Sequence, residues 1–246
     1  MNSLAQLRSI LSEVLCPGDD LVVHSSLRTL GEVPGGADSV LDALLEAVGP
    51  SGTLSMMAAT RTSFGTTKLF DLLNSPSETG VLTEVMRRRN PKNRSFVPMT
   101  SFVSAGKRAS EYLLPYNSFL DETSPLQRLI QNNGKILLLG VKFDRCTLFH
   151  LAEERHQVPY NFYMLFSGIG IDAASATQPI SQRYFVRKDL SLLKKPDLVS
   201  LPFVADPSLC FSAKCGDGEV YIFKAADYDN FMTQRLTEDP FCLVRD

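Results

Sequence analysis

The sequence is poor in histidine and cysteine, with three and five of them among 246 residues. The cysteines are odd in number and widely scattered, and no pair has the spacing of a zinc site. A disulfide framework and a cysteine-based zinc site are therefore excluded as organising features. Scattered free thiols are typical of a reducing compartment, so we expect a cytoplasmic protein without a metal centre.

The chain also lacks a strong charge excess and a long apolar run. Its formal net charge is −2, which leaves no electrostatic footprint for nucleic acid. No stretch of about 18 apolar residues exists, and the N-terminal segment shows helical spacing instead of a signal-peptide core. We therefore expect neither a nucleic-acid nor a membrane partner. The length and an apolar content of 44% predict a single domain over residues 1–246.

What the chain does contain is a pattern of alternating strands and helices. Apolar spacing predicts a helix over 4–15, a valine-rich strand over 21–26, a helix over 39–49 that Asp38 or Ser39 caps, and a strand over 52–60. This order is a βαβ unit, which indicates an α/β fold with a parallel or mixed sheet. Further helices are expected over 80–90, 124–134 (capped by Ser124), 146–157 and 227–239, with a buried strand over 135–141 and a loop-then-strand segment over 91–106.

Two segments have weaker patterns. Residues 61–78 are polar and predict an irregular loop. Residues 158–225 hold short β-like runs, RYFVR and EVYIF among them, which Gly and Pro interrupt. The C-terminal third, from about residue 160, is thus the part whose structure the sequence defines least.

The stretch HSSLRTLGEVPGG, which follows the first strand, is a candidate anion site. Ser25 and Ser26 offer hydroxyl groups, Arg28 offers charge, and Gly35 and Gly36 precede a helix N-terminus, where free N–H groups bind phosphate. The spacing fits neither a Walker A loop nor a dinucleotide-binding fingerprint. A surface turn that needs glycine remains the alternative.

The stretch CTLFHLAEE is a candidate catalytic helix. Thr147, His150 and Glu153 are three residues apart and share one helix face, just beyond a buried strand. A neutral imidazole there can accept a proton from a nucleophile while a carboxylate orients the ring, and Thr147 or a nearby helix N–H can bind an oxyanion. A packed helix with a hydrogen-bonded histidine is the alternative, and packing is also the simpler explanation for His24. A hydrolase that uses Ser25 or Ser26 stays open, although no G-x-S-x-G motif exists.

Taken together, these segments resemble one family, the aminoglycoside 3-N-acetyltransferases, which transfer an acetyl group from acetyl-CoA to an amine. The resemblance covers about residues 17–160. It rests on PGDDLVVHSSLRTLGEVPGGADSVLDALLEAVGPSGTL, then on FDLLNSPSETGVLTEVMRRRNPKNRS, and then on SPLQRLIQNNGKILLLGVKFDRCTLFHLAEE with VPY behind it. It implies an α/β/α sandwich with a mixed, mainly parallel sheet, distinct from the GNAT acetyltransferase fold. Acetyl-CoA as co-substrate and a small-molecule amine acceptor are implied too, and a homodimer is compatible with it.

The resemblance also implies roles for particular residues. His150 corresponds to the family's general base. The loop that holds the CoA phosphates corresponds to His24, Ser25, Ser26, Leu27, Arg28, Val33, Gly35 and Gly36, with Arg94 and Ser95 after the third helix. Asp71 and Glu78 fall in the acceptor-binding loop.

The chain departs from the family pattern in three places. Val97-Pro98 replaces a usual His-Pro, SMMAA lacks the proline of a usual V-M-P, and no E-N-D triplet follows VPY. The corresponding stretch, ISQRYFVRKDL, offers only Asp189 to support His150, so the supporting carboxylate is either Glu153 or Asp189. The basic residues of this stretch favour an anionic acceptor over a polycationic antibiotic.

The sequence thus predicts an acetyl-CoA-dependent N-acetyltransferase that acts on an amine of an amino sugar, either an aminoglycoside or an intermediate of polysaccharide or antibiotic biosynthesis. Two alternatives remain. One is a catalytically weakened relative that binds CoA or a nucleotide. The other is a Ser–His hydrolase.

Overall fold

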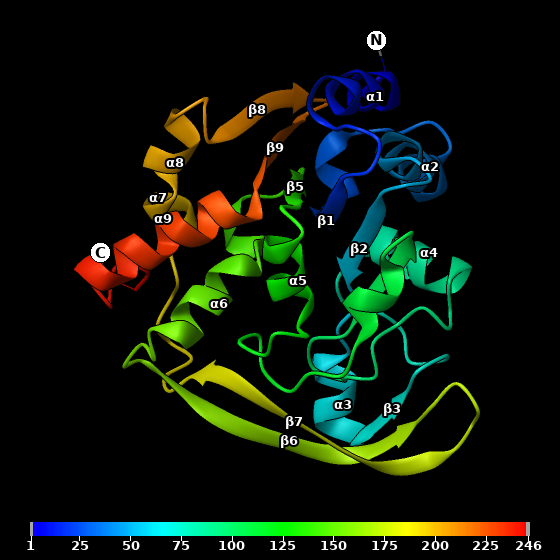
Figure 1. The fold of residues 1–246 in the computed structure, drawn as a ribbon, viewed down its shortest axis with the longest axis vertical. Helices are drawn as coiled ribbons and strands as arrows, with labels where there is room; N and C mark the ends of the chain where they lie inside the picture. The colour runs from blue at the N-terminus through cyan, green and yellow to red at the C-terminus, as the bar shows by residue number, and fades with distance from the viewer. Residues whose placement is uncertain (1, 245–246) are drawn as a thin grey trace.

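The computed structural model describes residues 2–244, and its centre is a six-stranded sheet in the order β4-β2-β1-β5-β9-β8 (Figure 1). The strands are β1 (Asp20–Ser25), β2 (Thr53–Met57), β4 (Phe102–Gly106), β5 (Lys135–Leu139), β8 (Cys210–Cys215) and β9 (Gly218–Lys224). β1 pairs in parallel with β2 and with β5, whereas β4, β9 and β8 pair with their neighbours antiparallel. The expected mixed sheet is confirmed, with the parallel pairing in its three central strands.

Helices cover both faces of this sheet. One core packs α1 (Ser3–Val14), α2 (Gly36–Val48) and α4 (Val81–Arg89) against alternate strand residues such as Leu21 and Val23. The other packs α5 (Pro125–Gln131), α6 (Leu148–Arg155) and α9 (Ala225–Glu238) against the residues between them, Val22 among these. Because successive side chains of a strand point to opposite faces, an apolar run such as LVV supplies both cores. The expected α/β/α sandwich is therefore confirmed.

The helix boundaries correct one expectation and confirm another. α2 begins at Gly36 with Gly35 as its N-cap, in the left-handed conformation at φ 75°, so Asp38 and Ser39 lie inside the helix instead of capping it. A side chain at position 35 would meet the Ser39 hydroxyl at 1.9 Å, so glycine is required there. At α5, the Ser124 side chain accepts a hydrogen bond from the Gln127 N–H, as a cap does, with Pro125 at the first turn.

The segment 61–78 is not an irregular loop, which corrects the expectation. It forms α3 (Arg61–Thr67) and the short strand β3 (Leu69–Asp71). Phe64 is the buried side chain of α3, so the sequence has no repeated apolar spacing that would predict this helix. Its N-terminus is held instead from outside by Glu78, whose carboxylate accepts hydrogen bonds from the N–H groups of Thr62 and Ser63, both at 2.8 Å. A capping interaction over this sequence distance leaves no local signal.

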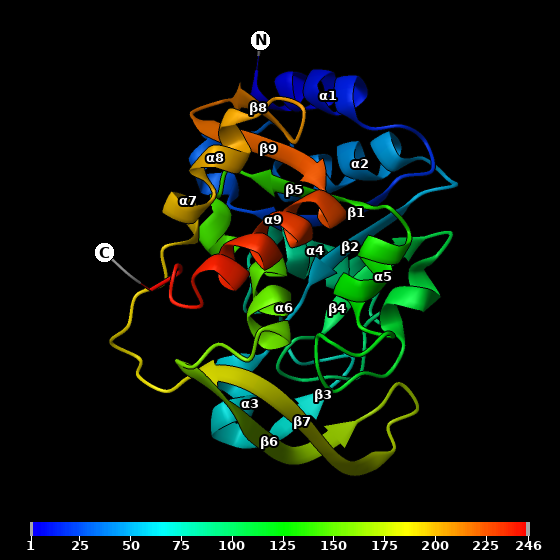
Figure 2. The same ribbon diagram turned by 60° about the vertical axis from the view of Figure 1, so that its left-hand side comes forward.

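Residues 161–187 form a long hairpin, where short broken strands were expected. β6 (Asn161–Ile171) and β7 (Thr177–Arg187) pair along their whole length, and β3 adds a third strand. Gly168 and Gly170 interrupt the β pattern because neighbours lie too close for side chains, the Lys68 carbonyl oxygen at 2.2 Å and the Phe96 ring at 2.4 Å from a Cβ placed there. Both views show this hairpin at the end of the molecule opposite α1 (Figures 1 and 2).

Buried polar contacts fix the hairpin to the rest of the protein. The Gln182 side chain accepts a hydrogen bond from the Met99 N–H at 2.9 Å and donates one to the Thr100 hydroxyl at 2.6 Å. The remaining helices, α7 (Pro196–Val199) and α8 (Leu201–Ala205), precede β8, and short 3-10 turns lie at Leu27–Leu30, Ala109–Leu113 and Phe143–Arg145. Within residues 2–244, no helix has the length and apolar character needed to cross a membrane.

Candidate active site

A cavity of about 780 Å³ opens beyond the carboxyl ends of β1, β2 and β5. β1 is the central strand of these three. The chain runs from β1 to β2 on one side of it and later returns to β5 on its other side, so the cavity lies at the topological switch point of the sheet. Open α/β sheets bind their ligands at this place. The lining includes His24, Ser25, Ser26, Thr29, Arg61, Glu78, Thr79, Lys142, Asp144, Arg145, Thr147 and His150.

His150 lies on α6 with one ring nitrogen bound and the other free. Its Nδ1 lies 2.8 Å from Oε2 of Glu153, one turn further along the helix. An ionised carboxylate can only accept a hydrogen bond, so Nδ1 carries the proton and Nε2 keeps its lone pair. Among residues 2–244, Nε2 has no hydrogen-bond partner, and a quarter of the side chain is exposed in the cavity. This is the arrangement of an oriented base that awaits a proton donor.

Glu153 is the expected partner that the structure brings to His150, and it has two further donors. The Lys194 ammonium donates to the same carboxylate oxygen at 2.7 Å, and the Tyr160 hydroxyl donates to Oε1 at 2.9 Å. The Glu153 side chain is fully buried. Burial alone would raise the pKa of this carboxyl, but the hydrogen bonds and charges of His150 and Lys194 together lower it. The carboxylate is therefore ionised and fixed in place.

The environment keeps the imidazole neutral. Burial, with the positive charge of Lys194 as the next cause, lowers the pKa of His150 to about 4, against the opposing effect of Glu153. A base with a depressed pKa is deprotonated above that value, so the lone pair of Nε2 is available at neutral pH.

We expect the variant Lys194→Met to lose activity in acid. Removing this ammonium takes away a charge that lowers the pKa of His150 and leaves Glu153, which raises it. The histidine pKa should therefore rise, and the acidic limb of kcat/KM against pH should move to higher pH by about one unit. The matched control is Lys188→Met, whose ammonium is exposed and donates to the Pro159 carbonyl. An unchanged acidic limb in Lys194→Met would contradict this electrostatic role.

His24 and Thr147 form a second pair in the cavity wall. The Thr147 hydroxyl lies 3.1 Å from His24 Nε2, and both residues are buried. Burial, with the nearby His150 as a minor cause, lowers the pKa of His24 to about 4, so this ring is also neutral. Thr147 is the N-cap residue of α6, yet its side chain makes no capping bond. Its hydroxyl is thereby held at the cavity surface beside the base.

The glycine loop, residues 24–36, runs from the end of β1 to the start of α2 and meets the cavity at its first residues. Ser25 and Ser26 line the cavity at the end of β1, and Arg28 is exposed, without a partner in the described part of the chain. Gly36 has space around it, since a Cβ there would meet nothing within 4 Å. Leu27 starts a 3-10 turn and, like Val33, packs against the core beneath the loop. Lys142 and Arg145, after β5, add positive charge to the cavity lining.

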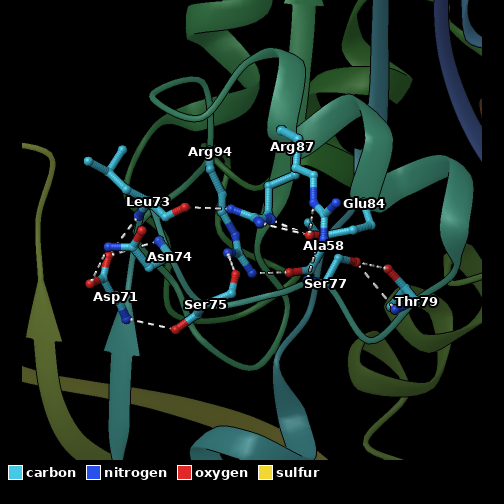
Figure 3. A network of polar contacts seen from close by, with 11 residues as sticks. Ala58, Asp71, Leu73, Asn74, Ser75, Ser77, Thr79, Glu84, Arg87 and Arg94 are labelled. Carbon is cyan, nitrogen blue, oxygen red and sulfur yellow. Dashed lines mark hydrogen bonds and ion pairs between the residues drawn. The ribbon is translucent and has the colours of Figure 1, made fainter. Parts of the chain in front are cut away.

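Arg94 and Ser95 lie outside this loop and do not reach the cavity. Arg94 is buried and its guanidinium donates to the carbonyl groups of Ser75 and Ala58 and to the Ser101 hydroxyl (Figure 3). Burial lowers its pKa to about 10. The Ser95 hydroxyl accepts from the Phe102 N–H. Both side chains make hydrogen bonds within the fold, so the CoA-phosphate role expected for them has no geometric support.

Of the two residues of the expected acceptor loop, one lines the cavity and the other does not. Glu78 lines the cavity but uses its carboxylate to hold the N-terminus of α3. Asp71 lies away from the cavity, and its carboxylate accepts hydrogen bonds from Leu73 and Asn74 (Figure 3). Asp189, the other expected support for His150, is exposed and bound to Ser191. Neither aspartate contacts the base.

The chain was compared with known proteins. The family model described as aminoglycoside 3-N-acetyltransferase matches residues 22–237. This chain belongs to the aminoglycoside 3-N-acetyltransferase family. An aminoglycoside N(3)-acetyltransferase III of Serratia marcescens is 35% identical over 58% of this chain and 60% of that enzyme, less than two thirds of its length. Another, of Pseudomonas aeruginosa, is 28% identical over 89% of this chain and 87% of that enzyme.

A solved structure supports the assignment along nearly the whole chain. A histidine-to-alanine variant of aminoglycoside acetyltransferase AAC(3)-IVa, in complex with a gentamicin, superposes with a TM-score of 0.80 at 26% identity. The superposition covers 98% of this chain and 91% of that one. The fold expected from the family resemblance is thus shown.

In this member of the aminoglycoside 3-N-acetyltransferase family, three site residues were missed by sequence reasoning. Lys194 supports Glu153 from the divergent C-terminal third, and no spacing links it to His150. Tyr160 supports Glu153 from the VPY stretch, whose role in the site the sequence did not reveal. Arg61 lines the cavity from the start of α3. The sequence could have indicated Arg61 as a site residue, because it directly follows the second strand of a βαβ unit, where functional residues gather.

Proposed function

We propose that this chain is an acetyl-CoA-dependent N-acetyltransferase that acetylates an amine of an amino sugar, with His150 as general base. The observation that carries the proposal is the pair of His150 and Glu153, with Nε2 free, inside a cavity at the switch point of the sheet. Membership of the aminoglycoside 3-N-acetyltransferase family, whose curated relatives are named for N-acetylation, supports it.

The reaction needs an uncharged amine beside a thioester carbonyl. His150 Nε2 takes the proton that the amine loses as its nitrogen forms the bond to the acetyl carbon. The carbon–sulfur bond then breaks and the thiolate of CoA leaves, to be protonated by the imidazolium or by water. The Thr147 hydroxyl, held by His24, is our candidate donor to the oxyanion of the intermediate. A fixed donor and a neutral base supply general acid–base and electrostatic catalysis without a covalent enzyme intermediate.

The glycine loop suits the phosphates of CoA. Arg28 and Lys142 make no hydrogen bond or ion pair within residues 2–244, although the charge of Lys142 acts on Asp144. α2 begins at Gly36, where the N–H groups of a first helical turn lack intrahelical partners. Arginine binds phosphate in a bidentate manner, and helix N-termini attract anions. We therefore assign Ser25, Ser26, Arg28, Gly35 and Gly36 to the acetyl-CoA side of the cavity, and the opposite side to the acceptor.

The geometry supports the two alternatives less well. A Ser–His hydrolase needs a hydrogen bond between nucleophile and base, and in the described residues neither Ser25 nor Ser26 donates one to a histidine. A non-catalytic relative was suggested by a missing carboxylate partner, and Glu153 occupies that position. Acetyl transfer therefore uses more of the observed site than either alternative.

Thiol release from acetyl-CoA in the presence of a panel of amino sugars tests the proposal. We expect turnover with at least one amine, and an Arg28→Ala variant with a KM for acetyl-CoA raised about tenfold or more, since hydrogen bonds to charged groups are worth about 1.5–3 kcal/mol. The control is Arg8→Ala, which removes an exposed arginine of α1 that pairs with Glu46. Absence of both turnover and CoA binding by calorimetry would refute the proposal.

A further inference from the structure

The charged side chains that line the cavity are mostly positive. Arg61, Lys142 and Arg145 face two acidic residues, Glu78 and Asp144. Both carboxylates are already engaged. Glu78 holds the Thr62 and Ser63 N–H groups and the Ser63 hydroxyl, and Asp144 pairs with Arg145 at 3.1 Å. The site therefore offers a ligand uncommitted positive charge and no uncommitted carboxylate from these lining residues.

Arg61 is the cavity cation whose charge acts on His150. It follows the carboxyl end of β2, whereas Lys142 and Arg145 follow β5. Its charge is one of those that lower the pKa of His150, which puts the guanidinium within electrostatic range of that ring. An anion bound at Arg61 would therefore lie in the same cavity as His150.

The Arg61 guanidinium is fixed but not satisfied. Its Nε donates to the Met99 carbonyl at 3.2 Å, its Nη2 meets the Met57 sulfur at 3.8 Å, and the group lies over the Tyr184 ring at 5.3 Å. Within residues 2–244, Nη1 has no partner, and no carboxylate binds any of its nitrogens. A planar donor set held in place by packing is preorganised to bind an anion.

The basic residues of β7 and of the position after it do not provide this charge. Arg183 stacks on the Tyr163 ring at 4.3 Å, Arg187 donates to the Leu192 carbonyl, and Lys188 donates to the Pro159 carbonyl. None of the three lines this cavity, although Arg183 borders a second, smaller pocket that also contains His150. The sequence suggested, from these basic residues, that the enzyme prefers an anionic acceptor. Such a preference must come from another residue, and Arg61 lies in the cavity.

We propose that Arg61 selects an acceptor that carries an anionic group, a phosphate or a carboxylate, close to its reactive amine. This inference rests on the proposed function, because it names the acceptor of that same site. A polycationic acceptor would bring several positive charges toward Arg61 without a free carboxylate to receive them, whereas a sugar phosphate or sugar acid would bind its Nη1 edge. Specificity then arises from both attraction and repulsion.

The inference is tested by measuring kcat/KM for a matched series of amino sugars that differ only at C6. Glucosamine, its 6-phosphate and its uronic acid share the amine and differ in charge. We expect kcat/KM for an anionic sugar to exceed that for glucosamine about tenfold or more, and the ratio to fall about tenfold in Arg61→Met, with partial recovery in Arg61→Lys. The control is Lys188→Met, which lies outside the site and should keep the ratio. An equal loss for both classes of acceptor in Arg61→Met, or a higher kcat/KM for kanamycin than for either anionic sugar, would overturn the inference.

A binding measurement separates this inference from the proposed function. Inorganic phosphate is titrated into the CoA-saturated protein while its melting temperature is followed. We expect phosphate to raise the melting temperature of the wild type and of Lys188→Met, but not of Arg61→Met. A missing shift in the wild type, or an equal shift in Arg61→Met, contradicts an anion site at Arg61. Absence of acetyl transfer together with the expected shifts contradicts only the proposed function.

Discussion

Replacing His150 with alanine is expected to lower kcat by about 100- to 10,000-fold, because general-base catalysis by a positioned side chain contributes about that much. Nε2 of this residue is a basic nitrogen without a hydrogen-bond partner among residues 2–244, and the buried Glu153 orients the ring. The KM for acetyl-CoA should change little, since Arg28, which we assign to the phosphates of CoA, stays in place. Steady-state kinetics at saturating acetyl-CoA measure the effect.

The matched control is another histidine at the end of the same helix. His156 caps α6, where its ring contacts the Ala152 carbonyl and the Thr237 hydroxyl outside the cavity. His156→Ala should keep kcat within about twofold, because surface substitutions away from special features have small effects. If His150→Ala retained wild-type kcat while its melting temperature was unchanged, the base would have to be another group.

Replacing Glu153 with glutamine is expected to damage both stability and activity. The exchange leaves the Lys194 ammonium, only 12% exposed, without its carboxylate, and an uncompensated buried charge costs about 3–5 kcal/mol. The Nδ1 proton of His150 also loses its ionised acceptor, so the tautomer that presents the Nε2 lone pair is no longer enforced. Chemical denaturation and kcat measure the two losses.

A double variant separates them. Glu153→Gln combined with Lys194→Met removes the stranded charge as well as the carboxylate, so most of the lost unfolding free energy should return. The catalytic defect should remain, because the imidazole still lacks its acceptor. Recovery of kcat together with stability would show that Glu153 acts only on the fold. The introduced amide can still accept the Tyr160 hydrogen bond through its oxygen, so persistent instability in the double variant would show that the lost carboxylate contact with His150 is the larger contribution.

Stability should also depend on pH through this cluster. The pKa of Glu153 is lower in the folded protein, so its contribution is present above its unfolded pKa and lost as the pH falls through the folded value. The folded pKa of His150, about 4, is depressed because burial favours the neutral ring. Folding with a neutral imidazole is opposed when the unfolded histidine gains a proton, below about pH 6.5. Both effects act in the same direction, toward lower stability in acid.

Local patterns in the sequence were sufficient for the central sheet and its helices. The run LVV at 21–23 and the run ILLL at 136–139 are apolar on both faces, which is the signature of strands covered by helices on either side. The parallel order followed from one βαβ unit. The hairpin of residues 161–187 was not predicted, because Gly168 and Gly170 interrupt the alternation of side chains that indicates a strand. α3 and Phe96 pack too closely against these two positions for a side chain.

The site was predictable to the extent that its parts are close in sequence. His150 and Glu153 are one helical turn apart, so spacing alone put them together. Lys194 lies 41 residues beyond Glu153, and no periodicity links the two. Arg94 shows the opposite error. Its sequence context suggested a phosphate ligand, but a residue type does not reveal burial, and each of its three guanidinium nitrogens donates to a carbonyl or hydroxyl group of the fold.

The placement of base and carboxylate on a single turn of α6 has an evolutionary consequence. This pair needs one short helix for its mutual geometry, whereas the acceptor side that we propose lies at Arg61 of α3 and at the loop before α4 that carries Glu78, which are separate segments of the chain. Insertions and substitutions in those segments can therefore alter which amine is accepted without taking apart the proton-accepting unit. Inherited chemistry and acquired substrate preference can change at different rates within one protein of this design.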